Sequence, residues 1–259
     1  MEYKNLLYET VERITTITIN RPPMNTLSYE TLEELGHAFA RAKNDPETKV
    51  VLFTGSGERA FVAGMDLKEF KLLPPLGGKE VAEKGQVLTL LIENMGKPTI
   101  AVVNGICLGG GTELALACTM RVASPNAKIG LPEVGLGIMP GYGGSQRLPR
   151  LVGEGRAMEI VLSAEPIDAE EAYRIGLVNK IFPRESLMQD SVRFAQRFSK
   201  NGAVSLSLAM QAVHHGLEMS LEQGLKLEAS LAGLTWDTED SREGAAAFWE
   251  KRKPIFKDK

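Results

Sequence analysis

Alternating apolar and polar residues open the chain and predict a β-hairpin. Residues 6–11 and 14–20 both alternate, and the polar residues 12–13 between them suit a tight turn. Ser28 then precedes a helical spacing that stops near residues 44–46, so we expect a capped helix. Its apolar face would consist of Leu32, Leu35, Ala38, Phe39 and Ala42.

Short apolar runs and helical spacings alternate in the next part of the chain. Runs at 50–54 and 99–103 predict buried strands, and the spacing over 81–95 predicts a helix between them. We expect residues 55–66 to form a loop. Pro74-Pro75 with Gly77-Gly78 predicts a flexible segment.

Helices dominate the remainder of the chain. A helix should follow the glycines near residue 110, a strand is expected at 121–124, and a short extended piece at 128–130. From about Gly143 the pattern is helical except for one strand at 177–182, and residues 185–251 are almost wholly helical in pattern. Alternating strands and helices followed by a helical third predict an α/β fold with a mainly parallel sheet and a helical C-terminal portion.

Composition and charge exclude several classes of protein. The chain has 259 residues, of which 43% are hydrophobic, and a net charge of −3, which argues against a general nucleic-acid or anionic-membrane surface. No apolar stretch approaches the roughly 20 residues that span a bilayer. The first residues carry neither a secretory nor a transit pattern, so we expect a cytoplasmic protein without a membrane partner.

Metal and thiol chemistry are not expected. Cys107 and Cys118 lie in apolar surroundings, which is typical of buried thiols in a reducing compartment. No Cys-x-x-Cys pair occurs, and His37, His214 and His215 are scattered, so no zinc site is predicted. Carboxylates then become the candidates for proton transfer.

Glu113 is the first candidate. It falls in the first turn of a predicted helix that begins in a triple glycine, Gly109 to Gly111. Such a helix start offers free N–H donors and favours a charged carboxylate, so Glu113 should stay ionised and could activate water. The alternative is a stabilising first-turn acid, which many helices carry.

Glu133 is the second candidate, in a loop punctuated by glycine and proline. An acid in a loop usually points into water. Here the loop is apolar, which predicts partial desolvation of Glu133, a raised pKa and a role as proton donor. The apolar neighbours are Leu131, Val134, Leu136, Ile138 and Met139. Two carboxylates in different environments can divide acid and base roles.

Several segments together resemble the crotonase, or enoyl-CoA hydratase/isomerase, superfamily, and the match covers nearly the whole chain in order. The N-terminal pieces are Asn20-Arg21-Pro22, Asn25-Thr26-Leu27 and Ala60-Phe61-Val62-Ala63-Gly64-Met65-Asp66-Leu67. The central pieces run from Lys97-Pro98 to Gly111-Thr112-Glu113-Leu114 and from Leu131-Pro132-Glu133 to Pro140-Gly141-Tyr142-Gly143-Gly144-Ser145-Gln146-Arg147-Leu148. The C-terminal pieces are Arg242-Glu243-Gly244 and Phe248 to Pro254.

The resemblance implies a fold and a ligand. The fold would be a ββα spiral core over residues 1–195, with C-terminal helices over 196–259 that build homotrimers or homohexamers. The substrate would be a coenzyme A thioester, with no further cofactor. The thioester oxygen would bind the N–H groups of Met65 and Gly110. The expected substrate contacts are Ala63, Asp66, Leu67, Lys68, Gly109, Pro140, Gly141 and Tyr142, with Arg59 and Lys253 as further candidates.

The presence of both glutamates favours one reaction of this superfamily. Hydratases carry acids at the positions of Glu113 and Glu133, so the resemblance implies reversible hydration of an enoyl-CoA, with a preference for short chains, in fatty acid metabolism. We expect Glu113 to activate water and Glu133 to exchange the proton at Cα. Another crotonase reaction, such as isomerisation or cyclic dienoyl-CoA hydration, and a non-catalytic or RNA-binding role stay open.

Three departures from the family pattern concern acyl specificity. Met65 stands where alanine or glycine is frequent, and its thioether would narrow the acyl pocket or pack against it. Tyr142 occupies a place that is often small and would shorten the accepted chain. Thr119 replaces a frequent aspartate, which would alter hydrogen bonding near the site.

Overall fold

A six-stranded sheet forms the centre of the fold. In the computed structural model, which describes residues 3–70 and 77–259, its strands lie in the order β1-β2-β3-β5-β7-β10. β1 and β2 form the predicted antiparallel hairpin, and all other neighbours are parallel. The bounds are β1 (Leu6–Val11), β2 (Ile14–Ile19), β3 (Val50–Gly55), β5 (Thr99–Val103), β7 (Met120–Ala123) and β10 (Lys180–Ile181).

A second, smaller sheet lies beside the first and was not predicted. Its order is β4 (Ala60–Val62), β6 (Ile106–Leu108), β8 (Lys128–Gly130) and β9 (Ile167–Asp168). The first three strands are parallel, and β9 runs antiparallel to β8. The pairs β3–β4, β5–β6 and β7–β8 each contribute one strand to each sheet before a helix follows. This repetition is the ββα spiral that the resemblance implied.

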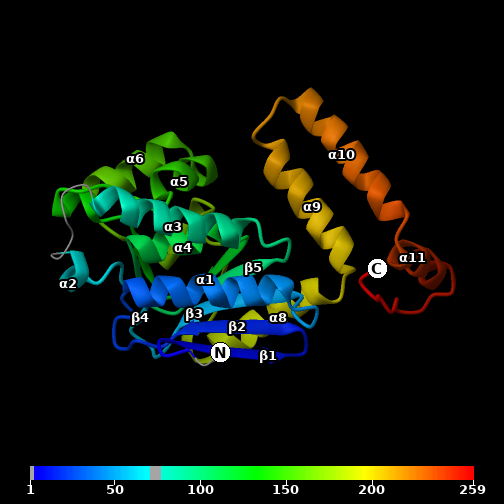
Figure 1. Cartoon of the computed structure of the whole chain (residues 1–259), viewed down its shortest axis with the longest axis horizontal. Coiled ribbons are helices and arrows are strands. Elements are labelled where there is room, and N and C mark those ends of the chain that lie inside the picture. Colours follow the sequence, from blue (N-terminus) through cyan, green and yellow to red (C-terminus); the bar gives the residue numbers. More distant parts are fainter. Residues whose placement is uncertain (1–2, 71–76) are drawn as a thin grey trace.

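The helices surround both sheets and then lead away from them. α9, α10 and α11 project to one side of the sheets, with the C-terminus near α11 (Figure 1). α8 continues past residue 195, so the expected division between core and C-terminal portion falls inside a helix. The helices are α1 (Tyr29–Asn44), α2 (Leu67–Phe70), α3 (Gly77–Glu93), α4 (Gly110–Ala117), α5 (Gly144–Val152), α6 (Glu154–Ser163), α7 (Ala169–Arg174), α8 (Leu187–Ser199), α9 (Ala203–Gly216), α10 (Leu221–Trp236) and α11 (Glu239–Trp249), with 3₁₀ turns η1 (Glu133–Leu136) and η2 (Arg184–Ser186).

Helices cover both faces of the central sheet, which explains the continuous apolar runs of its parallel strands. In β3, Val51 and Phe53 face the main core, which includes α1, while Val50 and Leu52 face α8. Phe53 meets Phe39 of α1 and Phe61 of β4 edge to face, with ring centroids 5.4 and 5.1 Å apart. These aromatic contacts join the two sheets to α1.

Some expected boundaries were wrong. Residues 55–66, expected to be a loop, contain the strand β4, whose three residues are all buried and therefore show no alternation. Gly77 and Gly78, expected in a flexible segment, are the first two residues of α3, where Gly77 is buried and Gly78 is exposed. Pro74-Pro75 lies outside the described residues. The strands β6 and β9 were also missed, being only three and two residues long.

Most other elements agree with the pattern of the sequence, but the strand expected at 177–182 is limited to β10, Lys180–Ile181. Ser28 caps α1 by accepting a hydrogen bond from the Thr31 N–H at 3.2 Å. The long helices of the C-terminal third lie where they were expected. None of the helices in residues 3–70 and 77–259 is both long and apolar enough to cross a membrane.

We expect Phe53→Ala to lower the free energy of unfolding by about 3–5 kcal/mol, because it leaves a cavity between α1 and both sheets. Urea unfolding followed by circular dichroism measures this change. Val11→Ala, at an exposed position of β1, is the control and should change stability by no more than about 0.5 kcal/mol. Equal losses in the two variants would contradict the assignment of Phe53 to the core.

Candidate active site

The site lies where three parallel strands of the smaller sheet end. β4, β6 and β8 run in the same direction, so the segments that follow them leave the sheet at one edge. After β4 the chain reaches Met65, and after β6 it reaches Gly110. After β8 it reaches Glu133, three residues beyond the strand. Strand pairing therefore brings together three predicted site residues that are far apart in the sequence.

Two glycines with positive φ allow these segments to touch. Gly64 has φ +97° and Gly109 has φ +55°, conformations that cost little only for glycine. A Cβ on Gly109 would lie 3.8 Å from the Gly64 Cα and 3.1 Å from Oε1 of Glu133. The turns after β4 and β6 are thus in contact, with the Glu133 carboxylate beside them.

Each glycine is followed by a backbone N–H that is free to bind a ligand. Leu27 hydrogen-bonds to the residues on either side of Met65. Its N–H donates to Gly64 O at 2.9 Å, and its C=O accepts from the Asp66 N–H at 2.8 Å. The Met65 N–H therefore points away from Leu27. Gly110 is the first residue of α4, where an N–H has no helical acceptor. Within the described part of the chain, neither N–H donates to another group.

Glu113 lies on α4, with its carboxylate turned toward the segment before α5. Its Oε1 accepts two backbone hydrogen bonds of 2.7 Å, from the N–H groups of Tyr142 and Gly144. The side chain is buried, and burial raises the pKa of Glu113 despite these N–H donors and the nearby Arg147 charge. The helix N-terminus therefore does not decide the direction of the pKa shift, because desolvation is the larger effect.

Glu133 is the first residue of the 3₁₀ turn η1, and not part of an irregular loop as expected. Its Oε2 is buried and has no hydrogen-bond partner among the described residues. Burial, with a smaller contribution from the negative charge of Glu113, raises its pKa to about 7 against the lowering effect of a backbone N–H. The predicted desolvation and raised pKa are confirmed.

The reason given for that burial was partly wrong. Leu131 is fully buried, but Leu136, Ile138 and Met139 are 61%, 39% and 65% exposed. Most of the apolar residues of this loop therefore point outward. The Glu133 carboxylate lies near the turn at Gly109, where an added Cβ would be 3.1 Å from its Oε1.

The remaining predicted contacts lie around these groups. Asp66 accepts from the Lys68 N–H at 3.1 Å and pairs with Arg21 at 3.5 Å, which fixes the start of α2. The side chains of Leu67 and Lys68 are exposed, as are the more distant candidates Arg59 and Lys253.

The segment Ala63–Met65 is partly buried between the β4 end and Leu27. The buried Pro140 precedes Gly141, whose carbonyl accepts from Gln86.

The Tyr142 ring is buried beside the free Gly110 N–H. A Cβ on Gly110 would lie 3.0 Å from the ring, and a Cβ on Gly85 of α3 would overlap it. The Tyr142 hydroxyl is buried without a partner among the described residues, and burial raises its pKa. Gly85 was missed by sequence reasoning, because a lone glycine inside a helix carries no sign of what packs against it.

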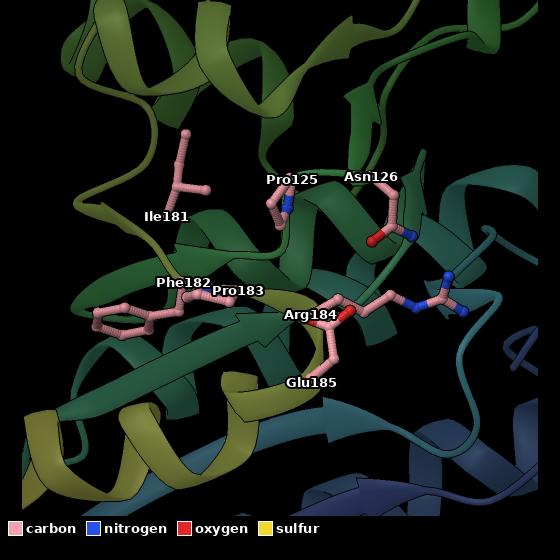
Figure 2. Close-up of a pocket in the computed structure, with 7 residues that line it drawn as sticks. All are labelled: Pro125, Asn126, Ile181, Phe182, Pro183, Arg184 and Glu185. Carbon is pink, nitrogen blue, oxygen red and sulfur yellow. The ribbon is translucent and has the colours of Figure 1, made fainter.

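A surface hollow of about 470 Å³ is lined by none of the predicted site residues (Figure 2). Its lining residues are Pro125, Asn126, Ile181, Phe182, Pro183, Arg184 and Glu185. In residues 3–70 and 77–259, no cluster of three or more His, Cys, Asp or Glu is placed to hold a metal ion. Cys107 and Cys118 are buried thiols, with the pKa of each raised to about 12 by burial.

Comparison with known proteins agrees with this geometry. The family described as enoyl-CoA hydratase/isomerase matches residues 9–259. The chain belongs to this family. Among enoyl-CoA hydratase/isomerase relatives, it is 44% identical over 257 residues to the crotonyl-CoA hydratase of Syntrophomonas wolfei, covering 99% of both chains. It is 41% identical to the short-chain-enoyl-CoA hydratase of Clostridium acetobutylicum, covering 98% of this chain and 97% of that protein.

Solved structures of the enoyl-CoA hydratase/isomerase family have the same fold. The crystal structure of an enoyl-CoA hydratase from Bacillus anthracis superimposes with a TM-score of 0.96 at 38% identity, covering 99% of this chain and 100% of that one. One from Geobacillus kaustophilus superimposes with a TM-score of 0.94 at 36% identity, covering 100% of both. The predicted crotonase fold is therefore confirmed.

The raised pKa of Glu133 predicts a pH-dependent cost in stability. Between pH 4.5 and about 7 the folded protein holds a proton at Glu133 that the unfolded chain releases, so stability falls as the pH rises through this window. Glu133→Gln should therefore be more stable than wild type at pH 8, by at most about 3 kcal/mol, and closer to it at pH 5.

Urea unfolding at the two pH values measures this difference. Glu165→Gln, at an exposed position after α6, is the control and should follow wild type at both. Equal stability of Glu133→Gln and wild type at pH 8 would contradict the burial of a carboxylate that is costly to ionise.

Proposed function

We propose that the protein is an enoyl-CoA hydratase that adds water reversibly across the α,β double bond of a short-chain enoyl-CoA, such as crotonyl-CoA to 3-hydroxybutyryl-CoA. The observation that carries the proposal is the pairing of two buried carboxylates, Glu113 and Glu133, beside two free backbone N–H groups. The relatives named crotonyl-CoA hydratase and short-chain-enoyl-CoA hydratase support the same substrate class.

In the proposed reaction the thioester oxygen accepts hydrogen bonds from the N–H groups of Met65 and Gly110. Polarisation of the carbonyl draws electrons from the conjugated double bond, so Cβ becomes electrophilic and an enolate is stabilised between the two donors. Each such donor contributes about 3–4 kcal/mol where its removal has been measured. The absence of other acceptors for these N–H groups within the described residues supports this role.

The two carboxylates then handle the protons. Glu113, ionised with help from the Tyr142 and Gly144 N–H groups, takes a proton from water as the water oxygen bonds to Cβ. Glu133 delivers a proton to Cα, for which a pKa of about 7 is well matched to neutral pH. Transfer of a proton from Glu113 to Glu133 through water restores the starting state. This chemistry requires no metal and no cofactor beyond the coenzyme A of the substrate.

The remaining site residues are proposed to bind the thioester and coenzyme A. Lys68 and Leu67 are exposed at the start of α2 and would meet the coenzyme A portion, with Asp66 fixing that turn. The other proposed contacts, which surround the acyl group, are Ala63, Gly109, Pro140, Gly141 and Tyr142. The buried ring of Tyr142 beside Gly110 supports a short acyl pocket.

We further propose that residues 196–259 form subunit contacts in a homotrimer or homohexamer, while residues 1–195 carry the site. The projecting helices support this division (Figure 1). They expose large apolar side chains that a partner copy would cover: Leu221, Leu234, Trp236, Phe248 and Trp249. A cytoplasmic role in β-oxidation is proposed on the same family pattern.

Wild-type protein should remove the conjugated-thioester absorbance of crotonyl-CoA, and product analysis should identify 3-hydroxybutyryl-CoA. Glu113→Gln and Glu133→Gln should each lower kcat by about 10²- to 10⁴-fold, because each removes a proton-transfer group. Glu165→Gln is the control. A shifted double bond without hydration would identify an isomerase. A substrate panel that includes cyclic dienoyl-CoA esters tests for cyclic dienoyl-CoA hydration. Failure to bind coenzyme A would reject the proposal.

Tyr142→Ala should extend the range of acyl chains. Removal of the ring opens space beside Gly110, so the ratio of kcat/KM for 2-octenoyl-CoA to that for crotonyl-CoA should rise about 10-fold or more. Tyr173→Ala, at an exposed tyrosine, is the matched control. An unchanged ratio in Tyr142→Ala would show that another residue limits chain length.

A further inference from the structure

The segment from Tyr142 to Gly144 is held from two opposite sides. On one side its N–H groups donate to Oε1 of Glu113. On the other side the carbonyl of Tyr142 accepts from Thr89 Oγ1 at 2.9 Å and from Arg147 Nη1 at 3.1 Å. The Tyr142 carbonyl belongs to the peptide unit between the two units that carry these N–H groups, so its anchors restrict the rotation of the segment that presents both donors to Glu113.

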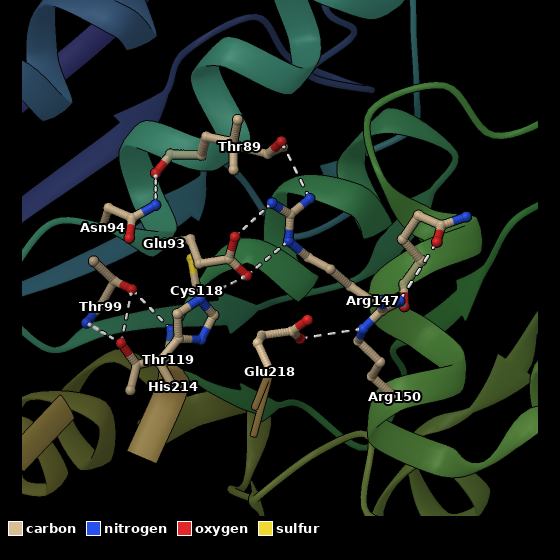
Figure 3. A network of polar contacts seen from close by, with 12 residues as sticks. Thr89, Glu93, Asn94, Thr99, Cys118, Thr119, Arg147, Arg150, His214 and Glu218 are labelled. Atoms are coloured by element: carbon tan, nitrogen blue, oxygen red, sulfur yellow. Dashed lines mark hydrogen bonds and ion pairs between the residues drawn. The ribbon is translucent and has the colours of Figure 1, made fainter. Parts of the chain in front are cut away.

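Arg147 is itself held in one orientation by Glu93. Its Nε and Nη2 donate to the two carboxylate oxygens of Glu93 at 3.0 and 2.7 Å, a two-point contact that fixes the guanidinium plane (Figure 3). The side chains are only 15% and 18% exposed. The guanidinium lies so close to Gly143 that a Cβ there would overlap Nη1.

One face of α3 supplies three of the side chains that hold this segment, directly or through Arg147. Gln86, Thr89 and Glu93 are spaced three and four residues apart, so they line one side of the helix. Gln86 Nε2 donates to the carbonyl of Gly141 at 2.9 Å, Thr89 holds that of Tyr142, and Glu93 holds Arg147. Side chains of α3 thus hold the carbonyl groups of this segment, while its N–H groups donate to Glu113.

We propose that Glu93 and Arg147 are positioning residues: through the carbonyl of Tyr142 they aim the Tyr142 and Gly144 N–H groups at the Glu113 carboxylate. The inference rests on the proposed function, because it assigns the pair an effect on the acid that activates water. An ion pair that only joined α3 to α5 would need no bond to the Tyr142 carbonyl. Here Nη1 of Arg147 donates to that carbonyl and also to Thr89 Oγ1 at 3.2 Å.

Direct charge effects on Glu113 must be separated from positioning. Among the described residues, the charged or titratable groups that interact with Glu113 are Glu133, Tyr142 and Arg147. His214 of α9 reaches Glu93, with Nε2 3.9 Å from Oε1, but not Glu113. Arg147→Lys keeps the positive charge and loses the two-point fork, so it isolates the geometric role.

A second ion pair on the same helix provides matched controls. Arg150 lies one turn after Arg147 on α5 and pairs with Glu218 at 3.4 Å, with both side chains 58% exposed. Figure 3 shows the two pairs beside each other. Arg150→Lys and Glu218→Gln repeat the substitutions Arg147→Lys and Glu93→Gln without touching the Tyr142–Gly144 segment.

The kinetic experiment compares these four variants on an enoyl-CoA that the wild type hydrates. Arg147→Lys and Glu93→Gln should lower kcat by about 10- to 100-fold with KM within about 3-fold of wild type, and the acidic limb of the kcat–pH profile should move to higher pH. In a Glu113→Gln background neither should cause a further loss. The controls should match wild type. A kcat for Arg147→Lys and Glu93→Gln equal to that of the controls would overturn the proposal.

A readout independent of catalysis keeps the two proposals distinguishable. Amide hydrogen exchange of Tyr142 and Gly144, followed by mass spectrometry or NMR, should quicken about 10-fold or more in Arg147→Lys and not in Arg150→Lys. Unchanged exchange would overturn the positioning role even if hydration is confirmed. If the wild type hydrates no enoyl-CoA, the proposed function fails, and exchange alone still decides whether Glu93 and Arg147 fix this segment.

Discussion

Parallel hydrogen bonding between β4, β6 and β8 places the chemistry of this molecule. These strands are only three residues long, yet their common direction delivers Met65, Gly110 and Glu133 to one edge of a sheet. The central sheet provides the rigid support, because β3, β5 and β7 immediately precede them and are buried under helices on both faces. A shift of one residue between β6 and either neighbour would separate the two N–H donors or withdraw the carboxylate.

Both carboxylates near this edge are buried, and burial sets the character of both acids. Burial disfavours the charged form of each carboxylate, and the protein compensates in two different ways. Glu113 receives two short backbone hydrogen bonds, so its charge is partly offset. The Oε2 of Glu133 has no partner among the described residues, and this group instead holds its proton to about pH 7. Two identical side chains thereby have different surroundings: backbone N–H groups and the Arg147 charge lie near Glu113, and Oε2 of Glu133 has no partner among the described residues.

Much of this could be predicted from the sequence, because the signals were local or came from long motifs. The hairpin of β1 and β2, the Ser28 cap and the α/β order follow from periodicity. Glu113 and Glu133 were recognised through glycine-rich segments and family resemblance. The pKa of Glu133 was predicted in the correct direction although the exposed side chain of Met139 contributes little to its burial.

The missed features depend on contacts between distant segments. β4 and β6 are too short to show a period, and the second sheet exists only because they pair. The pKa of Glu113 followed from its depth in the fold, which its place in the first turn of α4 could not reveal. Glu93 and Arg147 look like ordinary surface charges in the sequence, and only folding brings both to the segment around Tyr142.

The contact between Gly85 and Tyr142 has a consequence for how this family can diversify. The ring fits only because position 85 has no side chain, so a larger residue there excludes an aromatic residue at position 142. The two positions are therefore expected to covary among relatives, small with large or large with small. Evolution could remodel the volume beside Gly110 through this exchange on α3, without altering either glutamate.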